Sequence, residues 1–256
     1  MKNIAVLIAF LIFSGSYFSF SQSIITDRPD QTESAVTLEK GRLQIESGIL
    51  IQTEGEGANQ LNSLAVPTNL FRYGISSKVE LRLVLQLDGA EAYGDDTYQF
   101  ALGNIELGSK IVLNKKEDPT VQWALLSHLF LPGDDWGQFS EQVGFLNRLS
   151  IAHTIGEKVN VGYNIGYNHY AGGRGNYLYT LAVGFGLNDK WSIYVEPYGA
   201  VFTSSSPLPN FDYGLAYLVN DNLQLDLSFG TGLNNPMNYQ SLGISWRQKA
   251  KEKENQ

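Results

Sequence analysis

The residues best suited to charge chemistry are concentrated in one stretch, TDRPDQTES at residues 26–34. It groups two aspartates, an arginine and a glutamate around a proline: Asp27, Arg28, Pro29, Asp30 and Glu33. Carboxylates and a guanidinium can form ion pairs and charge-assisted hydrogen bonds with complementary groups, and proline stiffens the turn between them. The stretch can therefore pair with groups of opposite charge elsewhere in the chain.

The histidines and the acidic pairs indicate no metal centre. His128 is expected to point inward between two apolar neighbours, and His153 lies near a turn; neither has a second histidine or paired carboxylates at metal-ligand spacing. The segments DGAEAYGDD and PGDDWG lack the oxygen spacing of a calcium loop, so we interpret their acids as solvated loop charges. We expect no metal and no cofactor.

Residues 1–21 are predicted to be a signal peptide. Met1 and Lys2 precede an apolar run at 4–13, and Ser19 and Ser21 place small residues where a signal peptidase inspects the chain. The expected cut is before Gln22. The run is much shorter than the roughly 20 residues of a membrane helix, and the cysteine of a lipoprotein anchor is absent. We therefore expect an exported chain that is not tethered by its N-terminus.

Composition narrows the class of protein. The chain has no cysteine, 26 glycines, a formal net charge of -8 and a pI of about 4.9. An acidic balance without a basic stripe argues against nucleic acid as a partner. No segment after residue 13 is apolar enough for a membrane helix. If the chain meets a membrane, strands must span it.

From residue 40 to 247 the sequence predicts twelve antiparallel strands. Polar and apolar residues alternate most clearly in KVELRLVLQLD, KVNVGYNIGYN and NLQLDLSF, which begin at residues 78, 158 and 222. The first strand follows Gly41, and the others are expected at 64–75, 99–113, 120–131, 142–155, 177–187, 191–202, 211–219 and 239–247.

The connections between these strands alternate between two kinds. Short hydrophilic turns lie at 76–78, 114–119, 156–158, 188–190 and 220–222, and all but the last carry lysine, whereas the longer connections carry glycine, acids and aromatic residues. Periplasmic turns alternating with extracellular loops are typical of an outer-membrane up-and-down barrel. A soluble sandwich would also bury one face of each strand, but the asymmetry of the loops favours a transmembrane β-barrel.

Aromatic residues near the predicted strand ends fit the interfacial girdles of such a barrel. They are Trp123, Trp191 and Trp246 near the turns, and Tyr98, Phe100, Tyr167, Tyr177, Phe211 and Tyr239 near the loops.

The polar face of the predicted strands carries interleaved charges that we expect to line the lumen, where unlike charges can pair. They are Arg42, Glu46, Glu80, Arg82, Glu106, Lys110, Arg148, Glu196, Asp226 and Arg247. A barrel of about eight strands is filled by its own side chains and one of about sixteen leaves a channel, so twelve falls between. Several inward positions are glycine or alanine, among them Gly162, Ala182 and Gly184. They leave room for a thin passage, or simply let the sheet bend.

The charged stretch at 26–34 then has two interpretations. Residues 22–39 form an N-terminal segment that we expect on the periplasmic side. Either the segment folds into the lumen as a plug, with Arg28 pairing with Glu46, Glu80 or Glu106, or it is a flexible tail. Residues 248–256 form a charged tail after the last strand.

The stretch TDRPDQTES, the first strand after Gly41 and the glycine-rich strands together resemble a known family. It is the outer-membrane β-barrel family labelled as the MetA-pathway of phenol degradation, whose members are described as transporters. The resemblance covers the mature chain, and residues 26–34 are its sharpest motif. It implies an outer-membrane location, as in Gram-negative bacteria, and uptake of hydrophobic or aromatic solutes.

A second, local resemblance points to an enzyme. The stretch YNHYAGGRGN is similar to the histidine-containing segment of the outer-membrane phospholipase family, with His169 on the lipid-facing side of its strand. That family has a nucleophilic serine two residues after the histidine, because acyl transfer needs a hydroxyl beside an imidazole base. Here Ala171 occupies the position, so we predict no enzymatic activity.

The sequence thus favours an outer-membrane channel or transporter for an unidentified small solute. The alternatives are a structural or loop-presenting barrel and, with less support, a lipid-active enzyme. The expected partners are outer-membrane lipid, the solute, and the barrel-assembly machinery, for which Trp246 of the last strand is the candidate signal.

Overall fold

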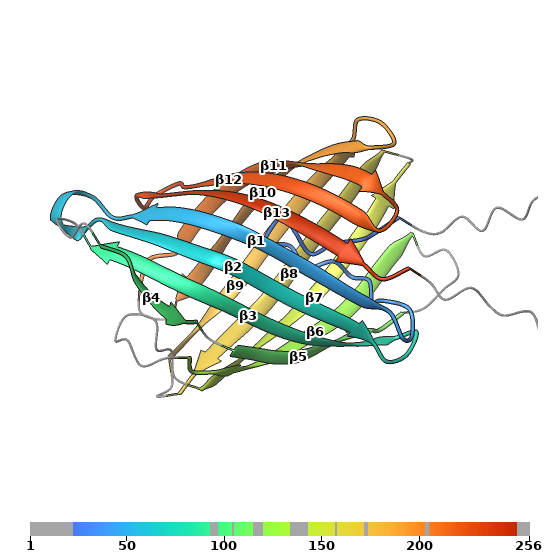
Figure 1. Ribbon diagram of the computed structural model, residues 1–256, viewed down its shortest axis with the longest axis horizontal. Helices are drawn as coiled ribbons and strands as arrows, with labels where there is room; N and C mark the ends of the chain where they lie inside the picture. Colours follow the sequence, from blue (N-terminus) through green and yellow to red (C-terminus); the bar gives the residue numbers. More distant parts are fainter. Residues whose placement is uncertain are drawn as a thin grey trace, which may run out of the picture.

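The strands of the protein close into one antiparallel barrel, shown by a computed structural model (Figure 1). The structure describes residues 23–92, 97–103, 105–114, 120–133, 143–156, 158–171, 174–202 and 205–249. The sheet order is β2-β1-β13-β12-β11-β10-β9-β8-β7-β6-β5-β3, with β4 beside β3, and pairing of β2 with β3 closes it. The predicted signal peptide at 1–21 and most of the C-terminal tail lie outside the described residues.

Strand bounds follow the alternation seen in the sequence. The strands are β1 (Leu43–Glu54), β2 (Leu61–Gly74), β3 (Val79–Ala92), β4 (Gln99–Leu102), β5 (Ile105–Val112), β6 (Val121–Leu131), β7 (Gly144–Ile155), β8 (Val159–Tyr170), β9 (Arg174–Gly186), β10 (Trp191–Phe202), β11 (Leu208–Asn220), β12 (Leu223–Gly232) and β13 (Met237–Arg247). A single 3-10 turn, η1 (Gly57–Asn59), is the helical element of the described chain.

The barrel wall has the twelve strand positions predicted from the sequence, although one of them is divided into two strands. The predicted strand at 99–113 consists of β4 and β5, which pair with successive parts of β3. The division falls beside Gly103, whose amide still bonds the Gln86 carbonyl at 3.0 Å but where the carboxylate of Asp88 leaves no room for a side chain.

Several connections are shorter than the predicted loops because the strands continue into them. β1 and β2 enclose six residues, 55–60, and β12 and β13 enclose four, 233–236. Backbone pairing of Glu54 with Leu61, and of Thr231 with Asn238, extends the ladders into polar sequence. The sequence predicts these polar residues to lie in loops. They form strands because strand formation depends on pairing partners, which the sequence does not reveal.

The two faces of the wall have opposite chemistry. Aliphatic residues point outward, as Leu81, Ile165 and Leu242 do with 48%, 61% and 58% of their surface exposed. Polar residues of the same strands point inward and are buried, among them Gln44, Glu46 and Glu80. An apolar outside around a polar inside is the arrangement of a transmembrane barrel. No helix in the described part of the chain is long and apolar enough to cross a membrane.

Aromatic residues at the barrel ends mostly face outward, as an interfacial girdle does. Trp123, Trp191 and Trp246 are each about two-fifths exposed at the end with the short turns. The prediction that Tyr239 belongs to the girdle is wrong. The strict alternation of β13 turns its side chain into the lumen, where its hydroxyl donates to Asp212 at 2.5 Å. Both ends of the described chain lie at the end with the short turns (Figure 1).

Candidate functional site

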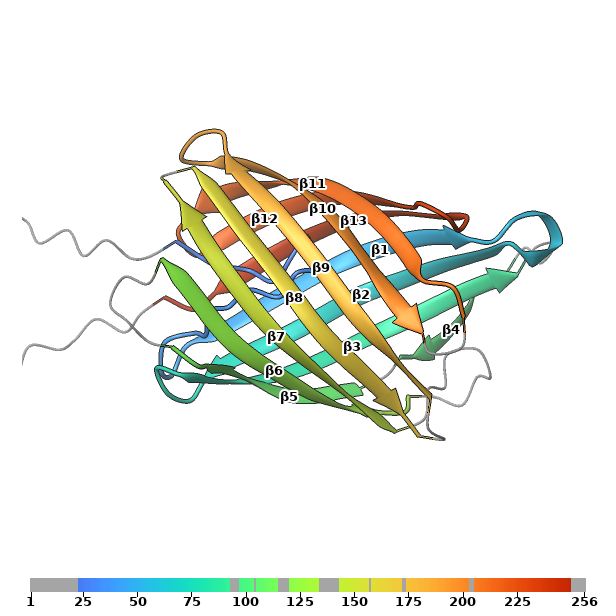
Figure 2. The same cartoon turned by 180° about the vertical axis from the view of Figure 1, so that it is seen from behind.

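Residues 23–40, which we call the plug segment, run inside the barrel without regular secondary structure (Figure 2). The inward carboxylates of three strands accept hydrogen bonds from its backbone amides. The pairs are Asp27 and Arg28 with Glu46 at 2.9 and 3.1 Å, Gln31 with Glu196 at 2.6 Å, and Leu38 with Glu80 at 3.0 Å. The barrel side chains therefore replace the backbone partners that an irregular buried segment lacks.

Asp27 is the point where the plug segment meets most of the barrel's buried positive charge. Its carboxylate lies 3.3 Å from Arg72, 2.6 Å from Arg82 and 2.9 Å from Lys110. Burial opposes ionisation of this group, but the three cations outweigh burial and hold the pKa of the Asp27 carboxyl well below its usual range. Asp27 is therefore an anion that the barrel is built to receive.

The plug segment supplies two of the four carboxylates that face the three cations of this cluster. Glu33 pairs with Arg82 at 2.8 Å and Lys110 at 3.3 Å. Without the segment, three cations would face two barrel carboxylates; with it, they face four. We call this group the charged cluster, and its members are Asp27, Glu33, Glu46, Arg72, Glu80, Arg82 and Lys110. Buried charges persist only when paired in this way.

The guanidinium of Arg28 fits a slot on β12, β13 and β1, next to the strands of the charged cluster, and does not bind the partners suggested by the sequence. Its guanidinium donates to Asp226 at 3.0 Å and to Ser241 at 2.8 Å, on β12 and β13. Gly48 and Gly243 pair across β1 and β13, and a side chain at either position would collide with the guanidinium. The side chains of Glu80 and Glu106 bond other groups, and Glu46 binds only the backbone amide of Arg28, because barrel register decides which acids the guanidinium reaches.

The plug segment meets the barrel at a third place, which is formed by acidic residues. Glu196 and Asp212 are directly opposite each other on β10 and β11, and both are fully buried. Thr32 donates its hydroxyl to Glu196 at 2.6 Å. Asp30 of the plug segment lies close to this pair, and burial together with the Glu196 carboxylate raises the pKa of Asp30 well above the ordinary value.

The other lumen residues named from the sequence also lie on the inner side. Glu106 contacts His128 at 2.7 Å, and His128 in turn accepts from Arg82 at 3.1 Å. Arg42 donates to Glu39 at 3.0 Å. Arg247 donates to Asn222 at 3.3 Å, at the end of the barrel with the short turns. Arg148 lies beside Gly166 on the inner wall.

Sequence reasoning missed two residues of this site, Arg72 and Asp212. Arg72 lies inside a predicted strand between Phe71 and Tyr73, which point outward, so alternation alone could have identified it as inward. Asp212 likewise precedes the outward Tyr213.

One part of the lumen is apolar. Leu126, Phe130 and Leu146 of β6 and β7 are buried on the inner side, and Tyr170 of β8 stacks on Phe130 with ring centroids 5.8 Å apart. We call these four residues the apolar patch. These side chains pack against one another inside the barrel and not against lipid, so this part of the interior has the chemical character that suits an apolar or aromatic group.

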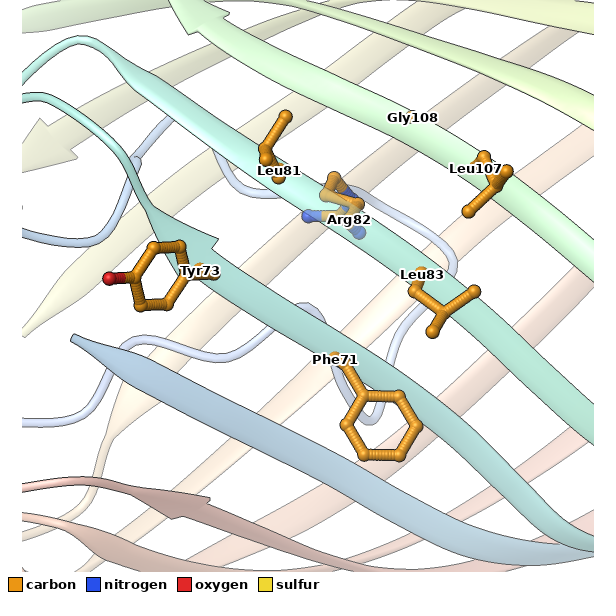
Figure 3. Close-up of a pocket in the computed structure, with 7 residues that line it drawn as sticks. All are labelled: Phe71, Tyr73, Leu81, Arg82, Leu83, Leu107 and Gly108. Carbon is orange, nitrogen blue, oxygen red and sulfur yellow. The ribbon is translucent and has the colours of Figure 1, made fainter. Parts of the chain in front are cut away.

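A separate groove lies on the outside of the wall (Figure 3). Its volume is about 340 Å³, and it is lined by residues of β2, β3 and β5: Phe71, Tyr73, Leu81, Arg82, Leu83, Leu107 and Gly108. Leu81 and Leu107 are nearly half exposed. Its apolar lining matches the lipid-facing surface around it.

Within the described residues, the contacts of His169 are with aromatic rings. Its ring lies 5.0 Å from that of Phe145 on the outer face, and Ala171, two residues later, carries no hydroxyl. Among the described residues, no group of three or more acids and histidines is arranged to hold a metal ion.

Comparison with known proteins identifies the family and the fold. The family described as "Putative MetA-pathway of phenol degradation" matches residues 26–247, and the chain belongs to it. No curated protein matches the sequence.

The fold recurs in solved outer-membrane channels. An outer membrane channel from Pseudomonas putida F1 has a TM-score of 0.65 at 14% identity, over 86% of this chain and 100% of that one. The KdgM porin has a TM-score of 0.53 at 13% identity over 79% and 98% of the two chains, and the NanC porin 0.52 at 10% over 80% and 98%. The charged stretch at 26–34 lies within the region that the family model matches.

Proposed function

We propose that this member of the family is an outer-membrane channel for small solutes with an apolar or aromatic face, and that its plug segment restricts the passage. The observation that carries the proposal is the apolar patch within a lumen that is otherwise polar. Phenol, which the family's description names, combines a flat apolar ring with one hydroxyl. Phe130 and Tyr170 offer stacking to such a ring, and the polar wall around them offers hydrogen bonds.

The proposal also covers export of the chain and assembly of the barrel. The chain is processed before Gln22, its N-terminal segment enters the barrel from the periplasmic end, and the machinery that assembles barrels recognises the strand that carries Trp246. N-terminal sequencing of the mature protein tests the processing site; an N-terminus other than Gln22 contradicts it. The proposal assigns no catalysis to the barrel, since Ala171 replaces the serine that lipid hydrolysis requires.

Uptake of phenol by cells tests the function directly. Porin-deficient Gram-negative cells expressing the protein take up radiolabelled phenol at low concentration, and their rate is compared with that of cells carrying an empty vector. We expect severalfold faster uptake with the wild type. The variants Phe130→Ala and Tyr170→Ala, checked for equal surface expression, should lose most of the gain. Equal rates with and without the protein would contradict the channel and leave a structural barrel.

A further inference from the structure

We propose that solutes pass the plug segment on one side only, between the segment and the wall formed by β7, β8 and β9, through a neck closed by hydrogen bonds of Thr32 and Glu33. The inference rests on the proposed channel function, and it adds where the passage opens and which residues control it.

The contacts of the plug segment differ in kind around the lumen. Towards β2, β3 and β5 they are ion pairs of the charged cluster, and towards β12 the ion pair of Arg28 with Asp226. Towards β8 and β9 the described contacts are uncharged. Hydrogen bonds between neutral groups are weaker than charge-assisted ones, so this is the side where the segment separates from the wall most readily.

The neck consists of contacts with two inward residues. The Thr32 hydroxyl lies 2.6 Å from the hydroxyl of Thr180 on β9. The Glu33 amide donates to the Asn164 side chain at 2.7 Å, and that side chain donates back to the Glu33 carbonyl at 3.1 Å. The carboxylate of Glu33 stays bound to Arg82 and Lys110, so the chain can part from Asn164 while its side chain remains anchored.

On the turn side of the neck, a cavity of about 370 Å³ already separates the plug segment from this wall. The wall is built of small residues, Ala152, Gly162, Ala182 and Gly184. The cavity reaches Thr154 and Asn160, which are exposed beside the turn at 156–158. A water molecule occupies about 30 Å³ in the liquid, so the space accommodates a small solute and not only solvent.

On the loop side of the neck, the inward residues of β8 continue the same line to the apolar patch. Asn168 donates to the hydroxyl of Tyr170 at 3.3 Å, and its carbonyl oxygen is buried without a hydrogen-bond partner in the described structure. One strand thus presents a continuous series of inward positions from the patch to the cavity: Tyr170, Asn168, Gly166, Asn164, Gly162 and Asn160.

Asp30 gives the passage its selectivity. It lines the cavity, and its carboxylate has no ion pair among the described residues, whereas Asp27 three positions earlier has three. A carboxyl group facing the passage exchanges hydrogen bonds with a passing hydroxyl group. The passage therefore favours neutral solutes that form hydrogen bonds, such as those with a phenolic hydroxyl.

A reversible lock tests the position of the passage. The chain has no cysteine, and a Cβ at Gly162 would lie 3.1 Å from Cγ2 of Thr32, so the pair Thr32→Cys and Gly162→Cys can form a disulfide. We expect the oxidised double variant to conduct at least about tenfold less than its reduced form in planar bilayers, with each single variant indifferent to reductant. Disulfide formation is verified by mass spectrometry. A formed lock with unchanged current would overturn the proposal.

A second measurement remains decisive if the lock does not form. Gly184→Cys places a thiol in the cavity, where the nearest neighbours of the added Cβ are two backbone carbonyl oxygens at 3.9 and 4.0 Å. Ser228→Cys is the matched control, a buried inward position on β12. A bulky cationic thiol reagent should block the current of the first variant and spare the second. Block of neither variant, in a protein that conducts, rejects this route but not the channel; absence of wild-type conduction rejects the channel itself.

Discussion

Asp27 is held by three cations that come from three different strands, so one side chain joins the plug segment to β2, β3 and β5. Its replacement by asparagine keeps the size of the side chain and removes the charge. Removing one partner of a buried ion pair typically costs about 3–5 kcal/mol, because the other charges remain buried.

The first prediction is that Asp27→Asn loosens the plug segment by about 3–5 kcal/mol. Limited proteolysis of the detergent-solubilised protein should cleave the N-terminal segment of the variant much faster than that of the wild type, while the barrel remains intact. Glu39→Gln is the control, because the Glu39 side chain is 54% exposed and its pair with Arg42 belongs to a class worth about 0–1 kcal/mol. Equal cleavage of Asp27→Asn and the control would contradict the role of the cluster.

The second prediction concerns pH. The pKa of Asp30 is raised in the docked state, so its contribution to docking is complete below the ordinary aspartate value of about 3.9 and is lost as pH rises through the raised value. The groups around it are acidic: Glu196 and Asp212 from the barrel and Asp27 from the segment. Alkaline conditions therefore loosen the segment through repulsion among these carboxylates.

Asp30→Asn should remove this alkaline loosening. Proteolytic cleavage of the N-terminal segment is measured over a series of pH values above the range in which an ordinary aspartate titrates. We expect cleavage to rise with pH in the wild type and to stay flat in the variant. A variant with the wild-type pH profile would assign the effect to another group.

At the residue scale, the sequence predicts which side chains face the lumen and fails to predict their partners. Alternation within a strand identifies Glu46 and Glu80 as inward, since it depends only on local geometry. The partner of Arg28 is Asp226, 198 positions away, and that contact depends on the register of strands at the barrel closure. No local pattern encodes it.

At the scale of elements, β1 and β13 together form a receptor for one side chain. Gly48 lies opposite Gly243, and this pair leaves the space that the guanidinium of Arg28 fills. The sequence indicates these glycines as inward and small, but without Arg28 in place they could equally serve the curvature of the sheet.

The third prediction is that Gly243→Val displaces Arg28 from Asp226 without unfolding the barrel. The added Cβ would collide with the guanidinium of Arg28 and with the Asp226 carboxylate, and both groups can move because each ends a side chain. We expect faster proteolysis of the N-terminal segment and an unchanged heat-dependent shift of the barrel on gels. Gly184→Val, whose Cβ meets nothing closer than 3.9 Å, is the matched control for proteolysis. A Gly243→Val protein as resistant as the control would show that the slot does not retain the segment.

Element boundaries show where sequence reasoning stops at this scale. The alternating core of each strand is readable, as in β3 and β8, because outward aliphatic residues repeat at every second position. The sequence does not predict how far β1, β2, β12 and β13 extend into polar sequence. In these extensions the ladder continues through backbone pairing with neighbouring strands and not through side-chain burial.

At the scale of the whole molecule, the barrel and its own N-terminal segment pair their charges in one interior. The barrel contributes cations on β2, β3 and β5 and an acid on β12, and the segment supplies an anion to the first group at Asp27 and a cation to the second at Arg28. The family, the twelve-stranded wall and the inward charges follow from sequence patterns. The path of the segment does not, because it has no regular secondary structure and is fixed only by contacts with distant residues.

The central claim is that the plug segment restricts a conducting lumen, and single-channel recording in planar lipid bilayers tests it most directly. The wild-type protein is compared with a variant that lacks residues 23–33, after both have been shown to fold by their shift on gels. We predict small currents from the wild type and severalfold larger currents from the deletion variant. Identical conductance and identical noise in the two proteins would contradict the claim.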